Sequence, residues 1–219
     1  MGNYVSLWGI VDNVNYLMQL RQVLPTEVKD GRRVSKFQDG RYPFLFPGAL
    51  SMFGGAVEKC ETLDQAFRRE MREELPRLDL SGRLSEPVTY DFTKIDEVDE
   101  VYGRINEFFR GNVDSFLGFD LNGHVPNCAL GNRGREILEK IGTTKMSYRD
   151  WLSLFVGKTS FFRVDINREA ALGLEDKEGA GRVLVPYRVL KNITMEPADK
   201  LAALDHLRMR VEAREISIE

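Results

Sequence analysis

The spacing of apolar residues near the start of the chain predicts strands rather than helices. Tyr4 to Val11 is rich in aromatic and β-branched residues, and Tyr16 to Arg21 is a second short apolar run after the turn-forming pair Asp12-Asn13. We expect these two runs to be neighbouring strands. Gln22 to Tyr42 is polar and charged, which predicts a long connection that serves either as a binding loop or as a plain surface loop.

A glycine-bearing loop and then a helix are expected next. Phe44 to Val57 is apolar but interrupted by glycine and proline, and glycine lets a backbone approach a ligand closely. Thr62 and Gln65 have the form of a capping box, which predicts that a helix begins near Leu63. Proline cannot continue a helix, so we expect this one to end before Pro76.

Three glutamates of this helix lie where a surface helix would not place them. At about 100° per residue, an apolar stripe is formed by Leu63, Ala66, Phe67 and Met71. Glu70 and Glu74 fall inside that stripe and Glu73 lies beside them, so the three carboxylates are expected to converge. Unpaired carboxylates on a half-buried face are costly. We therefore prefer a divalent metal site to a solvated salt-bridge helix, which would turn its glutamates away from the core.

The rest of the chain mixes strand and helix patterns. Strands are expected at Pro87 to Phe92, Val101 to Phe109, Phe161 to Ile166 and Gly181 to Pro186. Helices are expected at Arg133 to Ile141, at Ser147 to Phe155 with Ser147 as the cap, and at Pro197 to Val211. We interpret the last as a packing helix without chemistry. The pattern predicts an α/β fold, with residues 1–219 forming a single domain.

Composition narrows the classes of function. The 219 residues, 42% of them hydrophobic, are enough to form the core of one domain. The net charge of -3 lacks the excess of basic residues that proteins binding a nucleic acid polymer usually have. No apolar run is long enough to span a membrane, and the start of the chain lacks the pattern of a secretion signal. Two cysteines without ligand-like pairing and only two histidines favour a cytoplasmic location and argue against zinc.

The segment that begins at Gly55 resembles the Nudix box. That pattern is Gly, five residues, Glu, seven residues, Arg-Glu, an aliphatic residue, any residue, Glu-Glu, any residue, Gly and an aliphatic residue. It is matched with intact spacing by Gly55, Glu61, Arg69, Glu70, Met71, Glu73 and Glu74. Pro76 and Arg77 depart from it at the far end, and Cys60 stands where glycine is common. We expect these departures to affect the turns around the helix and not the metal site.

The resemblance implies a Nudix-type α/β/α sandwich with a mixed central sheet. It implies Mg²⁺, or Mn²⁺, bound by Glu70, Glu73, Glu74 and the backbone carbonyl of Gly55. Arg69 would orient one of the box glutamates, and Glu61 would support the loop or the ligands.

The resemblance also implies a catalytic set, in which Glu73, Glu74 and Arg69 act with a general base. That base is a box glutamate or an acidic residue on a later loop, where Glu178 is our candidate and Glu175 the next. The competing interpretation of both residues is a solvated acidic turn in the sequence LEDKEG.

The function that the resemblance implies is metal-dependent hydrolysis of the phosphoanhydride in a nucleoside diphosphate linked to another moiety. A nucleotide sugar or ADP-ribose is favoured, and other substrates of the family, including oxidised nucleoside triphosphates, remain open. A non-catalytic nucleotide-sensing or protein-binding module of the same fold is the alternative. An isoprenoid diphosphate isomerase is a second one, which Cys60 does not obviously support. The region at about 112–158 exceeds what a minimal Nudix protein needs, so it could shape substrate choice or a homodimer contact.

Overall fold

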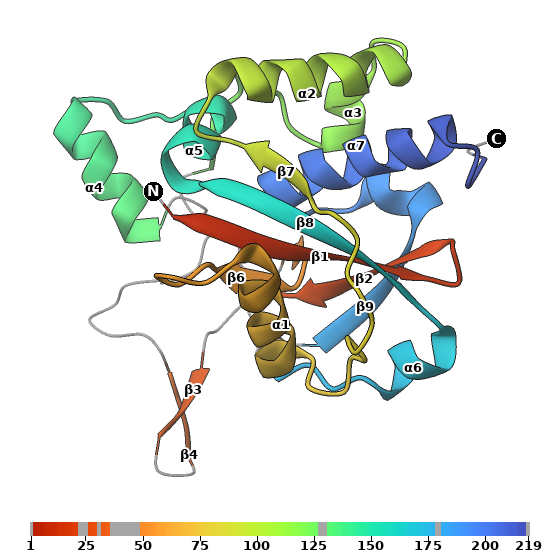
Figure 1. Ribbon diagram of the computed structural model, residues 1–219. Coiled ribbons are helices and arrows are strands. Elements are labelled where there is room, and N and C mark those ends of the chain that lie inside the picture. The colour runs from red at the N-terminus through yellow and green to blue at the C-terminus, as the bar shows by residue number, and fades with distance from the viewer. Residues whose placement is uncertain are drawn as a thin grey trace.

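The computed structural model describes residues 2–21, 26–29, 32–35, 49–126, 131–177 and 181–217, and a mixed sheet organises them (Figure 1). Its strands are β1 (Asn3–Val11), β2 (Asn15–Leu20), β5 (Leu50–Ser51), β6 (Gly54–Ala56), β7 (Val88–Asp91), β8 (Lys158–Ile166) and β9 (Gly181–Pro186). The order is β5-β2-β1-β8-β7, with β6 also paired to β1 and β9 to β2. Only β1 and β8 pair in parallel, so this sheet is mixed, as predicted.

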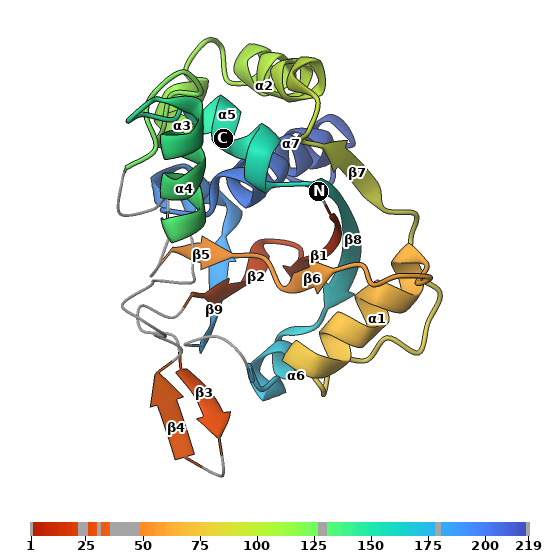
Figure 2. The same ribbon diagram turned by 90° about the vertical axis from the view of Figure 1, so that its left-hand side faces the viewer.

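The predicted pairing of the first two strands is confirmed. β1 and β2 are antiparallel and are joined through Asp12 and Asn13, whose φ values of 49° and 58° are ones that Asp and Asn tolerate well. The segment Gln22 to Tyr42 is predicted as a long connection. Part of it forms a separate antiparallel hairpin of β3 (Thr26–Lys29) and β4 (Arg32–Ser35), which the sequence analysis did not predict (Figure 2). The other residues of that segment lie outside the described residues.

Helices cover both faces of the central sheet. α1 (Leu63–Glu74) and α6 (Arg168–Gly173) lie on one face, and α2 (Ile95–Phe108), α3 (Val113–Leu117), α5 (Tyr148–Phe155) and α7 (Pro197–Glu212) lie on the other (Figures 1 and 2). The sheet has a hydrophobic core on each face, and successive side chains of β1 pack into the two cores alternately. They do so because neighbouring residues on a strand point to opposite faces. Leu7 packs with α1, whereas Trp8 packs with α7. The predicted α/β sandwich is therefore confirmed.

Most later elements match the predictions, with one clear error. The segment Val101 to Phe109 is not a strand but the second half of α2. Val98, Val101 and Ile105 are its buried residues, and this helical spacing overrides the weak alternation that suggested a strand. The short elements α3, α6 and η1 (Tyr187–Asn192) were not predicted, whereas α4 (Gly131–Ile141) was. Within the described residues, no helix is both long and apolar enough to cross a membrane.

A buried histidine links α7 to the sheet. The ring of His206 stacks on that of Trp8 with centroids 3.9 Å apart, and its Nδ1 forms a 2.9 Å hydrogen bond with the Tyr16 hydroxyl. Burial, helped by the positive charges of Arg210 and Arg163, lowers the pKa of His206 to about 3. The folded chain therefore keeps this imidazole neutral at pH values where an unfolded chain would protonate it.

Lowering the pH from 7 to 5 is expected to reduce the free energy of unfolding by about 2 kcal/mol through His206 alone. The sign follows because the unfolded histidine binds its proton near pH 6.5, whereas the folded one does so only near pH 3. Urea unfolding of the native chain and of His206→Asn at both pH values isolates this contribution, since other groups cancel. His124→Asn at the exposed second histidine is the control. The same pH dependence in native and His206→Asn chains would contradict the prediction.

Candidate active site

The glutamate-bearing helix α1 begins and ends where the sequence predicted. Thr62 Oγ1 accepts a hydrogen bond from the Gln65 backbone at 3.2 Å, and Gln65 Oε1 accepts one from the Thr62 backbone at 2.9 Å. This completes the capping box, and Leu75 caps the other end just before Pro76. The buried residues of the helix are Ala66, Phe67, Met71 and Glu74. Glu74 therefore lies on the apolar face, as its phase indicated.

Two glutamates of α1 lie against the glycine pair of β6. Glu74 is 6% exposed, and its Oε2 accepts the Gly54 N–H at 2.7 Å. The Glu70 carboxyl group lies directly over Gly55, since a Cβ added at Gly55 would be 2.5 Å from Glu70 Oε1. Only glycine leaves room for this approach. Both carboxylates thus meet one short stretch of backbone, from positions one helical turn apart.

Arg69 holds two of the box glutamates together. Its Nε and Nη2 donate to Glu61 at 2.9 and 3.0 Å, and its Nη1 donates to Glu70 at 2.7 Å. Nη2 also donates to the Ala56 carbonyl at 2.8 Å. The hydrogen bond from Arg69 holds the pKa of Glu61 below its usual value, while the bonds to Glu61 and Glu70 raise the pKa of Arg69. Arg69 therefore favours the ionised form of Glu61 and ties Glu61, which precedes α1, to Glu70 on the helix.

Glu73 does not join Glu70 and Glu74 at a common point. Its side chain is 54% exposed, and its Oε2 lies 3.7 Å from Arg69 Nη1. Across the ranges that the structure describes, no three His, Cys, Asp or Glu side chains are placed to hold a metal ion together. The expected convergence of three carboxylates is therefore wrong for this geometry. The physical reason is that Glu73 points to the exposed side of α1, whereas Glu70 and Glu74 lie against Gly55 and Gly54.

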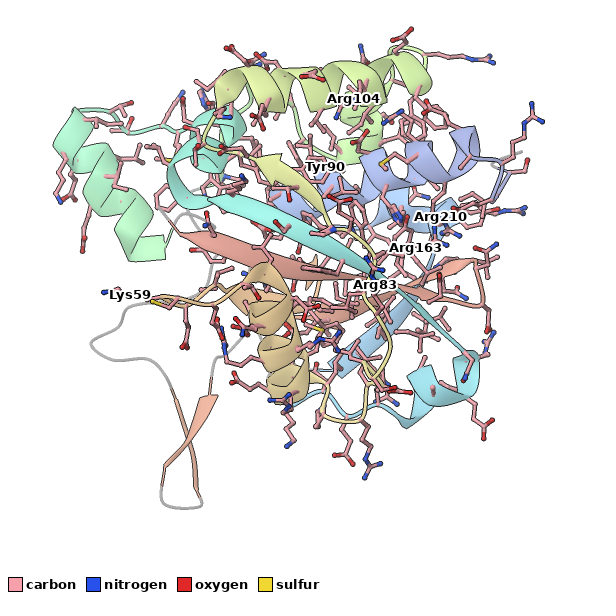
Figure 3. The ribbon with its side chains drawn as sticks, in the orientation of Figure 1. Lys59, Arg83, Tyr90, Arg104, Arg163 and Arg210 are labelled. Atoms are coloured by element: carbon pink, nitrogen blue, oxygen red, sulfur yellow. The ribbon has the colours of Figure 1, made fainter. Side chains whose placement is uncertain are left out.

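The loop that leads into α1 turns at Cys60, next to Lys59 at its tip (Figure 3). Cys60 is exposed and its φ is 70°, a left-handed conformation that glycine adopts most easily. The conformation of this turn is thus one that glycine would adopt without strain, although cysteine occupies the position here.

The candidates for the general base lie on the chain after α6. Glu175 forms a 3.0 Å ion pair with Arg77, and both side chains are more than half exposed, so Glu175 faces solvent. The backbone N–H of Lys177 donates to the Glu74 carbonyl at 3.2 Å, which ties this stretch to the end of α1. Glu178 itself lies outside the described residues.

A cavity of about 270 Å³ lies beside Gly54 and Gly55. The topology makes room for it, because β1 pairs with β6 over its first half and with β2 only from Gly9 onward. The cavity walls include Tyr4, Ser6, Arg21, Met52, Trp151 and Phe155. The last two belong to α5, so the region at 112–158 contributes an aromatic wall next to the box.

Two acidic residues at the start of α7 also line this cavity. Glu196 and Asp199 are each 8% exposed, and the Met52 N–H donates to Asp199 Oδ2 at 2.7 Å. Burial raises the pKa of both carboxyl groups, and the charge of Asp199 raises that of Glu196 further, while Arg21 acts in the opposite direction.

Sequence reasoning missed this acidic pair because α7 was interpreted as a packing helix. Acidic residues are normal at the beginning of any helix, where they complement the helix dipole, so Glu196 and Asp199 carried no distinguishing signal. Their position beside the box depends on how β6 and α7 meet in space. The Met52 contact of Asp199 spans 147 positions of the chain.

A larger cavity, of about 450 Å³, lies on the opposite side of the sheet from α1, between β7, α2 and α7. The buried Asp205 lines it and accepts hydrogen bonds from Tyr90 at 3.0 Å, Arg104 at 3.3 Å and Arg208 at 2.8 Å; Figure 3 labels Tyr90 and Arg104. None of its lining residues belongs to the box. The smaller cavity is therefore the better candidate for the active site, despite its size.

Comparison with known proteins gave matches to solved structures only. No family model and no curated protein matches the sequence. A mutT/nudix family protein from Listeria innocua is 13% identical, with 99% of this chain and 98% of that chain covered and a TM-score of 0.46. The E. coli dihydroneopterin triphosphate pyrophosphohydrolase is 13% identical, with 95% of each chain covered and a TM-score of 0.45. The chain resembles the Nudix family in its motif, and Nudix proteins are among the solved structures to which it is similar.

A third similar structure is the NUDIX domain of Shewanella oneidensis NrtR in complex with ADP ribose. It is 12% identical, with 98% of this chain and 87% of that chain covered and a TM-score of 0.43. The structures that this chain resembles thus include Nudix proteins, as the box predicted.

Proposed function

We propose that the chain is a metal-dependent hydrolase that cleaves the phosphoanhydride of a nucleoside diphosphate linked to another moiety. A nucleotide sugar or ADP-ribose is the favoured substrate class. The observation that carries the proposal is the seating of two carboxylates, Glu70 and Glu74, on the Gly54-Gly55 backbone beside a cavity of ligand size. Because carboxylates and a diphosphate are all negatively charged, they repel one another unless a cation lies between the carboxylates and the diphosphate.

The donor set fits Mg²⁺ or Mn²⁺. Oxygen ligands suit both ions, and Mg²⁺ is commonly held by one or two carboxylates together with water and substrate phosphates. Glu70 and Glu74 would be those carboxylates, the Gly55 carbonyl would add a backbone oxygen, and the exposed Glu73 would contribute from the rim. When bound, the ion neutralises charge on the phosphate oxygens and makes a bound water more acidic.

The residues of the chain would then divide the remaining work. Arg69 positions Glu70, and the Gly54 N–H positions Glu74, so neither carboxylate needs to reorganise during the reaction. Water attacks phosphorus, a new P–O bond forms, and the bond to the bridging oxygen breaks. The proton lost by the water passes to a carboxylate, for which Glu73 and Glu178 are the proposed bases.

A non-catalytic module that senses a nucleotide or binds a protein partner is the competing proposal. Such a module would not require Glu70 and Glu74 to lie against the same glycine pair. It would also not require Arg69 to orient Glu70 through a hydrogen bond. The two proposals differ in turnover and agree on nucleotide binding.

The test is a panel of nucleoside diphosphate derivatives that covers nucleotide sugars, ADP-ribose and dinucleoside polyphosphates. We expect at least one to be hydrolysed with Mg²⁺ or Mn²⁺, with loss of turnover after chelation and recovery when the ion is returned. Reaction in ¹⁸O-labelled water identifies the phosphorus that is attacked. Nucleotide binding without turnover of any member, with either metal, would refute the hydrolase and favour the sensing module.

A further inference from the structure

We propose that the cavity beside the box holds the base of the substrate and that Glu196 and Asp199 select a base with two neighbouring N–H donors, as in guanine. The inference rests on the proposed function, because it names the substrate class of the same site. It also changes the role of α7, whose first turn would recognise the ligand as well as pack against the sheet.

The walls of the cavity suit a flat aromatic ring. Phe155 of α5 and Tyr4 of β1 are half-buried and line it, whereas Trp151, which also belongs to its wall, is only 1% exposed. Aromatic side chains stack on bases without regard to sequence. The volume of about 270 Å³ is close to the low end of the range for small-molecule sites, roughly 300 Å³, so it suits a base and not a longer polymer segment.

The charge of the cavity decides which part of a nucleotide enters it. The cavity wall combines the carboxyl groups of Glu196 and Asp199 with the guanidinium of Arg21, so it offers no net positive charge to the anionic phosphates of a substrate. The phosphates are then left to the cation that Glu70 and Glu74 would hold. The part that enters is uncharged and must supply hydrogen-bond donors, because buried carboxyl groups are costly without partners.

The existing contacts of the pair show where donors are needed. Asp199 Oδ2 already accepts the Met52 N–H, which fixes the orientation of that carboxyl group. An ionised carboxylate offers about four acceptor positions, so most of them can still serve a ligand. In the described part of the chain, no ion pair and no side-chain hydrogen bond ends at Glu196, although it is more than nine-tenths buried.

Guanine matches this acceptor pattern better than adenine does. Its N1–H and its exocyclic amino group are adjacent donors, which a carboxylate accepts in a bidentate arrangement. The matching edge of adenine has one amino donor beside a ring nitrogen that accepts, and an ionised carboxylate would face that lone pair. Among the favoured substrates, guanosine diphosphate derivatives are thus expected to bind better than ADP-ribose.

The test compares the binding of guanosine, inosine and adenosine monophosphates to the full chain by calorimetry. Inosine monophosphate differs from guanosine monophosphate only in lacking the exocyclic amino group. We expect guanosine monophosphate to bind about 10-fold tighter or more than either of the others. Equal affinities for the guanosine and inosine nucleotides would overturn the proposal.

A matched pair of variants assigns the selectivity to the acidic pair. Asp199→Asn keeps the size of the side chain and an oxygen for the Met52 N–H, but replaces one acceptor with a donor. The preference for guanosine over inosine monophosphate should fall to about 1-fold, and a preference that survives would refute the assignment. Glu196→Gln serves if Asp199→Asn does not fold, and Glu100→Gln at the other cavity is the control that should keep the preference.

Failure of this inference can be told apart from failure of the proposed function. In Glu74→Gln, hydrolysis should be lost while the base preference is kept. An active hydrolase without base preference refutes only the role of Glu196 and Asp199. A chain that prefers guanosine monophosphate but hydrolyses nothing on the panel refutes only the hydrolase.

Discussion

Glu74→Gln should lower kcat/KM for hydrolysis by about 10³-fold while leaving the free energy of unfolding nearly unchanged. Glutamine retains a carbonyl that can accept the Gly54 N–H and fills nearly the same volume, so the 2.7 Å hydrogen bond survives. What it removes is the negative charge. A cation in such a site supplies several kcal/mol of charge stabilisation, and each 1.36 kcal/mol is worth tenfold in rate.

Steady-state kinetics over a series of Mg²⁺ concentrations, together with urea unfolding, measure both halves of this prediction. Asp64→Asn is the matched control, because Asp64 lies in the first turn of α1, is half exposed and pairs only with Arg68 in the described structure. It should leave kcat/KM unchanged. If Glu74→Gln kept full activity, the carboxylate would be a structural partner of Gly54 and nothing more.

Local sequence signals explain why α1 could be predicted in detail. The ends of α1 are determined by residues within a few positions of them, namely Thr62, Gln65 and Pro76. Such residues can be recognised in the sequence before the three-dimensional structure is known. The phase of Glu74 against the apolar stripe is equally local. What could not be derived was the contact of Glu74 with Gly54, which depends on β6 pairing with β1.

Signals that depend on distant packing were missed or misinterpreted. Val101 to Phe109 alternates well enough for a strand, and only the core on that face of the sheet selects the helical phase of α2. Glu196 and Asp199 look like ordinary helix-start residues until the divergence of β1 and β2 leaves a cavity beside them. Sequence alone thus located the glutamate-bearing side of the candidate site and left the side formed by Glu196 and Asp199 unassigned.

Gly54→Ala is expected to destabilise the fold by more than about 3 kcal/mol. The φ of Gly54 is 149°, which L side chains rarely adopt. A Cβ at this position would lie 2.8 Å from the Ser6 Cα and closer still to the Val5 carbonyl oxygen. Both are backbone atoms of β1, which pairs with β6 and with β8, so neither can move aside cheaply.

Urea unfolding of Gly54→Ala measures this cost, and Gly82→Ala is the matched control. Gly82 is exposed, has no positive φ, and an added Cβ there would meet nothing within 4 Å, so we expect a change within about 0.5 kcal/mol. Native stability in Gly54→Ala would show that β1 and β6 can separate. Because Glu74→Gln keeps the hydrogen bond to Gly54, comparing the two variants separates backbone strain at the glycine pair from loss of charge at the carboxylate.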